Sequence, residues 1–271
     1  MSTPLIAPMT GSEEMQANTP RQKTYGSLPT INGCNEAYQH ADADITLISS
    51  DGFHFKVHSY QLMASSPVFR GMIHAGALSQ KQKEVTFTDE RLERSRIVAL
   101  FLDICYGKPL PPFPHYGPNT YDELEGSLCD LISFLQKYDC RPAIEHLRLY
   151  LGSWIKDVNS SPADSLVLAA KLEDQELAML AIQETGLSED LDNFGCSTEL
   201  AYIDGSSNMD LSGMWYDRFI EIPDDYKYAL LRGYRYERPF IDLDTTNWEA
   251  VAKEFGNVLT AIHNRKRPDK Q

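Results

Sequence analysis

The chain has 271 residues, which is enough for one large domain or two smaller ones, each with a buried core. Its formal net charge of −14 repels a phosphate backbone, so we expect no direct contact with nucleic acid. No apolar run is long enough to span a bilayer, and the first residues lack a secretory signal. We therefore expect an intracellular protein of the nucleus or cytoplasm, without membrane contact and with five cysteines as free thiols.

The first 40 residues are rich in Ser, Thr, Pro, Gly, Asn and Gln. This composition predicts a disordered or loosely attached arm. Beyond it, apolar and polar residues alternate over 44–49 and again over 53–57, on either side of a Ser-Asp-Gly turn. That pattern predicts a β-hairpin.

Two short helices are expected next, over 59–64 and 66–76. Ser66 is a candidate N-cap and Pro67 fits the first helical position, while Gly76 ends the helix. The cap is expected to bring Phe69 and Met72 into the core. A third strand is predicted over 84–88.

Helical spacing dominates the rest of the chain. Apolar residues at 97–105 predict a helix that Gly107 ends, and a proline-rich connection follows over 108–119. Further helices are predicted over 124–138, 141–158, 161–172, 177–186, 223–230 and 248–262. We expect a main domain over 41–158, a helical hairpin over 159–186 and an irregular, helical extension over 187–271.

Several short elements of the chain form a recognisable set: Asp44-Ile-Thr-Leu, Phe55-Lys-Val-His58, Leu62, Ser66-Pro-Val-Phe69, Met72 and a helix that ends in Tyr106-Gly107. They resemble the BTB/POZ family, and their style is similar to the BTB proteins of fungi. The resemblance implies an α+β fold, a small mixed sheet flanked by helices, with an α-helical C-terminal extension whose start resembles a BACK domain. It also implies that Asp44 is partly buried with backbone hydrogen bonds and that His58 caps the turn into the next helix.

The resemblance implies a non-catalytic protein–protein interaction module that acts as a scaffold, a transcription-related regulator or an adaptor. Other proteins are the expected partners, a homodimer among them. Cullin-dependent ubiquitin-ligase adaptors carry an acidic residue where this chain has Ser79, and corepressor-binding members carry a basic residue where it has Ser59. A cullin therefore stays an alternative partner. The candidate partner-facing residues are Ser59, Ala77, Leu78 and Ser79.

No motif for catalysis, a cofactor or a metal is apparent. His54 and His58 are four residues apart, but on a strand and without a third ligand, and no Cys-x-x-Cys pair occurs. The chain also lacks a Gly-x-Ser-x-Gly elbow and a phosphate-binding loop. We expect no enzyme and no cofactor, and a small hydrolase with a scattered site is the alternative from another class.

Overall fold

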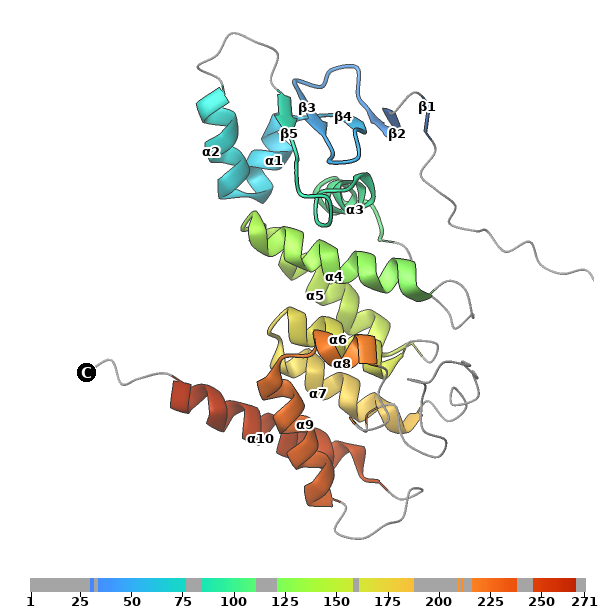
Figure 1. The fold of residues 1–271 in the computed structure, drawn as a ribbon, viewed down its shortest axis with the longest axis vertical. Coiled ribbons are helices and arrows are strands. Elements are labelled where there is room, and N and C mark those ends of the chain that lie inside the picture. The colour runs from blue at the N-terminus through green and yellow to red at the C-terminus, as the bar shows by residue number, and fades with distance from the viewer. Residues whose placement is uncertain are drawn as a thin grey trace, which may run out of the picture.

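The computed structural model describes residues 30–31, 34–76, 84–110, 121–157, 161–187, 209, 211, 216–237 and 246–266 (Figure 1). The strands are β1 (Thr30–Ile31), β2 (Cys34–Gln39), β3 (Ile45–Ile48), β4 (His54–Val57) and β5 (Glu84–Thr86). The helices of the first half are α1 (Ser59–Ser65), α2 (Pro67–Gly76), α3 (Ser95–Cys105), α4 (Tyr121–Lys137) and α5 (Arg141–Ile155). Those of the second half are α6 (Pro162–Lys171), α7 (Gln175–Gln183), the short 3-10 helix η1 (Glu184–Leu187), α8 (Tyr216–Glu221), α9 (Asp224–Glu237) and α10 (Trp248–Lys266).

The strands form one mixed sheet in the order β1-β2-β4-β3-β5. The predicted hairpin is confirmed: β3 and β4 are antiparallel with Leu47 opposite Phe55, and both side chains are fully buried. The turn between them needs a left-handed residue, which Gly52 supplies at φ +82°. Strand β5 pairs with β3 in parallel and is an edge strand of the sheet.

The strand β2 differs from the expectation of a loose arm up to residue 40. It pairs in parallel with β4, and Tyr38 is only 1% exposed. The Tyr38 hydroxyl donates a hydrogen bond to the Asp103 carboxylate on α3, and the Lys108 ammonium lies 3.9 Å from the centre of the Tyr38 ring. One aromatic side chain therefore anchors a segment that is otherwise polar. The rest of the predicted arm, residues 1–29, lies outside the described residues.

The helix α2 begins as predicted, because the backbone N–H of Phe69 donates to the Ser66 hydroxyl at 3.1 Å. Phe69 and Ile73 are buried, whereas Met72 is 38% exposed, so the expectation that Met72 enters the core is wrong. The reason is helical geometry: residues four apart share a face, so Phe69 and Ile73 point inward together and Met72 follows Val68 on the outside.

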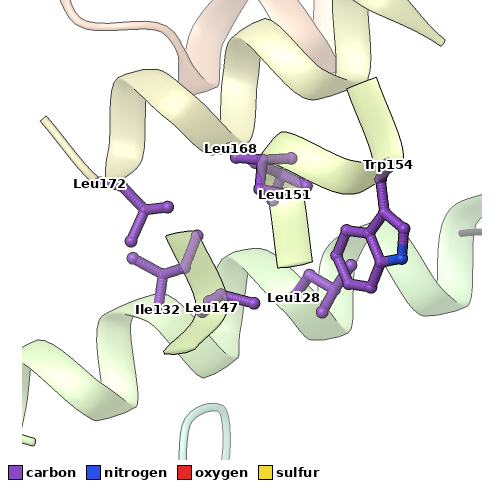
Figure 2. Close-up of a pocket in the computed structure, with 7 residues that line it drawn as sticks. All are labelled: Leu128, Ile132, Leu147, Leu151, Trp154, Leu168 and Leu172. Atoms are coloured by element: carbon purple, nitrogen blue, oxygen red, sulfur yellow. The ribbon is translucent and has the colours of Figure 1, made fainter. Parts of the chain in front are cut away.

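The second half of the molecule packs directly onto the first. Seven apolar side chains from α4, α5 and the C-terminal end of α6 meet with no space large enough for a water molecule (Figure 2). They are Leu128, Ile132, Leu147, Leu151, Trp154, Leu168 and Leu172. The helices α6 and α7 form the predicted pair, and the Ser161 hydroxyl caps α6 by accepting from the Asp164 N–H at 3.2 Å.

The helices then continue as a stack away from the sheet. In Figure 1 the sheet, α1 and α2 lie at one end of the molecule and α9 and α10 at the other. The predicted helices at 223–230 and 248–262 are both present and longer than expected, as α9 and α10. Across the described ranges, no helix is long and apolar enough to cross a bilayer.

Candidate protein-interaction site

The start of α1 is held by a carboxylate from the preceding strand region. Asp44 accepts the backbone N–H of Ser59 and the Ser59 hydroxyl, each at 2.6 Å. Ser59 is only 5% exposed. Its side chain is therefore turned inward to Asp44, which corrects the expectation that Ser59 faces a partner.

His58 occupies the N-cap position of α1, but its side chain makes no capping bond. Its Nδ1 lies 2.9 Å from the Tyr106 hydroxyl, and its Nε2 lies 3.2 Å from a carboxylate oxygen of Asp42. The Tyr106 hydroxyl also accepts the His58 backbone N–H at 3.0 Å. The expected side-chain cap is thus replaced by a bridge from the end of β4 to the end of α3.

The two residues that end α3 have separate tasks. Tyr106 is the C-cap, and its ring stacks on His40 with centroids 5.2 Å apart. Burial is the main cause that raises the pKa of Tyr106, so its hydroxyl stays protonated as a hydrogen-bonding group. Gly107 follows with φ +66°, a left-handed conformation that favours glycine.

The start of α2 is tied to the end of α4. The Ser66 hydroxyl donates to the carbonyl of Tyr138 while it accepts from Phe69, and the Phe69 ring stacks on Tyr138 with centroids 4.7 Å apart. Leu62 and Phe69 are fully buried. These signature residues build the fold and do not present a binding surface.

The outer face of α2 is different. Val68, Gly71, Met72 and Ala75 are all exposed and follow the i, i+3, i+4, i+7 spacing of one helical face. We call these four residues the α2 stripe. Sequence reasoning missed it because the buried set of the same helix was expected to include Met72. The other candidate partner-facing residues, Ala77, Leu78 and Ser79, lie outside the described residues.

Comparison with family models finds a match to the BTB/POZ domain over residues 34–152. Residues 34–152 form a BTB/POZ domain. BTB domains are protein–protein interaction modules that often dimerise. The match begins at β2 rather than at residue 41, in agreement with the buried Tyr38. A comparison with curated proteins found no match.

A groove lies where the BTB domain meets the helices that follow it. Its volume is about 570 Å³, and it runs between α5 and α7 with Leu149, Leu177 and Leu180 among its lining residues. Leu149 is 78% exposed, which is high for a leucine. Arg148 closes one side through an ion pair with Asp174 at 3.2 Å. The groove therefore offers apolar surface between charged walls.

Two cysteines of the BTB core lie in surroundings that disfavour the thiolate. Burial raises the pKa of the Cys105 and Cys140 thiols to about 12, so neither provides a thiolate nucleophile near neutral pH. Within the described segments, no three His, Cys, Asp or Glu side chains are placed to hold a metal ion.

Proposed function

We propose that this protein is a non-catalytic adaptor, and that its BTB domain binds another protein through the α2 stripe. The observation that carries the proposal is the exposure of Val68 and Met72, each 38% exposed, on a helix whose opposite face is already buried. Burying apolar surface of this kind contributes about 25 cal/mol per Å² to association, before the entropic cost of binding is subtracted.

The surroundings of the α2 stripe support this role. The stripe itself carries no charge, and the guanidinium group of Arg70, on the same helix, is held by hydrogen bonds to the Met63 carbonyl at 2.8 and 3.2 Å. Uncharged apolar surface bordered by polar groups is typical of the centre of a protein interface.

An adaptor needs two surfaces on one body. The α5–α7 groove is the second, and the apolar junction of Figure 2 joins its α5 wall to the BTB core. A partner held at α2 and another held in the groove would then keep a fixed distance. This arrangement supports a scaffold or adaptor, a role that requires binding but no catalysed reaction.

The test is cross-linking mass spectrometry of partners captured by the tagged full chain from native lysate. V68E/M72E is expected to lose the partners held at the α2 stripe and to keep those held in the groove, whereas L149E, which changes an exposed leucine of the groove, is expected to have the opposite effect. A set of partners that V68E/M72E leaves identical to the wild-type set would contradict the proposal. Turnover of an ester or phosphate substrate by the purified chain would overturn the non-catalytic part.

The same comparison separates the kinds of partner. A cullin that is recovered with wild type and lost with V68E/M72E would place the protein among ubiquitin-ligase adaptors. Failure to recover a cullin at any stringency would rule out the role of a ubiquitin-ligase adaptor. Light scattering after size exclusion tests the other kind of partner, since a dimer that V68E/M72E converts to a monomer identifies a second copy as the partner.

A further inference from the structure

The helix α9 has one face fixed against its neighbour. Tyr226, Ala229 and Leu230 are buried, and Gly233 lies so close to α10 that a Cβ placed on it would be 2.8 Å from the Val251 carbonyl oxygen. The Tyr226 ring also meets the Phe255 ring edge to face, with centroids 5.7 Å apart. This packing sets which side of α9 faces the solvent.

The solvent side of α9 carries a second exposed stripe. Tyr228 is 52% exposed and Leu231 is 48% exposed, and Arg232 and Arg235 are exposed beside them. The four residues follow the i, i+3, i+4, i+7 spacing of one helical face. We call them the α9 stripe. It combines an aromatic ring, an aliphatic side chain and two guanidinium groups, whereas the α2 stripe has no charge.

The arginines of the α9 stripe differ from the other charged groups around them. Lys227 pairs with Asp224 at 3.3 Å, and Asp225 pairs with His263 and Lys266 at 3.2 and 3.1 Å. Arg232 and Arg235 form no ion pair with a residue that the structure describes. Two guanidinium groups that have no ion-pair partner among the described residues therefore stand on one face of a chain whose net charge is −14.

We propose that the α9 stripe binds an acidic, amphipathic helical segment of another protein. Guanidinium groups bind carboxylates through paired hydrogen bonds, and Tyr228 and Leu231 supply the apolar contact that such a segment would bury. From Tyr228 to Arg235 the stripe extends about 11 Å at 1.5 Å per residue, which matches two turns of a partner helix. This surface is separate from the α2 stripe and does not depend on it.

Charge decides between this partner and a nucleic acid. Interactions between exposed charges are screened beyond about 8 Å at physiological salt, so a short acidic helix meets the two arginines without strong repulsion from the rest of the chain. A phosphate backbone is longer than the stripe and would meet the average field of a chain whose net charge is −14. A peptide segment therefore fits where a polyanion does not.

The test is selection of displayed peptides of about 16 residues, long enough for four helical turns, on the immobilised full chain. The peptides retained are expected to be enriched in Asp and Glu next to apolar residues at helical spacing. Their affinity, measured by fluorescence anisotropy, is expected to fall as salt rises. A selected set without acidic enrichment would overturn the proposal.

Matched variants locate the binding. R232E/R235E is expected to lower the affinity for the selected peptides by at least about tenfold. L231A is expected to lower it about tenfold, because an apolar contact is lost. K253E/R265E makes the same change in charge on exposed positions of α10 and is expected to leave binding within about twofold.

Three results would contradict the proposal. One is equal binding to wild type and R232E/R235E. Another is binding of the full chain to phosphatidylserine vesicles that exceeds peptide binding and is lost in R232E/R235E, which would assign the stripe to a lipid surface. The third is a wild-type dimer that R232E/R235E dissociates, which would assign it to a second copy. These measurements do not involve the α2 stripe or the variant V68E/M72E. The proposal for the α9 stripe can therefore fail while the proposal for the α2 stripe holds, and the reverse is also true.

Discussion

The carboxylate of Asp44 accepts two hydrogen bonds from a single residue, Ser59, through its backbone N–H and its hydroxyl at 2.6 Å each. This pair fixes the start of α1 against the sheet. It also accounts for the burial of Ser59. The serine that replaces a basic residue of the corepressor-binding pattern thus has a structural task in this chain.

Replacement of Ser59 by alanine is expected to lower the free energy of unfolding by about 1.5 kcal/mol, because the hydroxyl bonds to a charged acceptor. Urea unfolding followed by circular dichroism measures the change. S153A, at an exposed position of α5, is the control and should shift the midpoint little. Equal midpoints for S59A and wild type would show that the Asp44–Ser59 hydroxyl bond contributes nothing.

Ser66→Ala is expected to cost about 2 kcal/mol, since it removes the cap of α2 and the hydroxyl that the Tyr138 carbonyl accepts. Thermal unfolding of S66A and of the adjacent S65A makes the comparison. The Ser65 hydroxyl donates to the Gln61 carbonyl within its own helix, so S65A should be milder. A larger loss in S65A than in S66A would contradict the capping role.

Two glycines in helices should respond to alanine with opposite signs. Gly126 on α4 is exposed and has open space where a Cβ would lie, so G126A is expected to stabilise by about 0.5 to 1 kcal/mol through helix propensity. At Gly233 the Cβ would meet the Val251 carbonyl at 2.8 Å, and G233A is expected to destabilise by about 2 kcal/mol. Thermal unfolding of both variants provides the measurement, and a stabilising G233A would mean that α9 and α10 are not in close contact.

Acid is expected to weaken the contact between Lys137 and two carboxylates. The Leu92 backbone N–H and then Lys137 lower the pKa of Asp89 to about 2. Burial alone would raise the pKa of Glu93, but hydrogen bonds from Lys137 and Tyr138 outweigh it and the pKa is lowered. A carboxyl whose pKa is lower in the folded state stabilises the fold above its unfolded pKa, about 3.9 for aspartate. That stability is lost as pH falls toward 2.

The variant K137M isolates this effect. In urea unfolding from pH 6 to 2.5, it should be less stable than wild type at pH 6, and the gap should shrink as the carboxylates protonate. K253M, at an exposed lysine of α10, serves as the control and should show no such convergence. A gap between wild type and K137M that stays constant over this range would contradict the assignment.

Local patterns in the sequence predicted most elements of the fold correctly. The β3–β4 hairpin follows from alternation around a Ser-Asp-Gly turn, and α2 and α6 begin at Ser-Pro caps, because both signals depend on a few neighbouring residues. The same signals failed for β2, whose single buried aromatic has its partner Asp103 at a separation of 65 residues. A polar strand with a single buried aromatic residue does not show the alternation of apolar and polar residues that predicts a strand.

The candidate site divides in the same way. The sequence by itself determined the BTB resemblance and the residues that build it, because Asp44, His58, Ser66 and Tyr106 stand at fixed spacings along the chain. Only the tertiary structure decided which side chains face outward. The side chain of Ser59 points inward because it donates a hydrogen bond to Asp44. Met72 points outward because Phe69 and Ile73 occupy the buried face of α2. The α9 stripe is exposed because Gly233 lets the opposite face of α9 pack closely against α10. Helical periodicity gives the angle between side chains, but the direction of the core comes from contacts between residues distant in sequence.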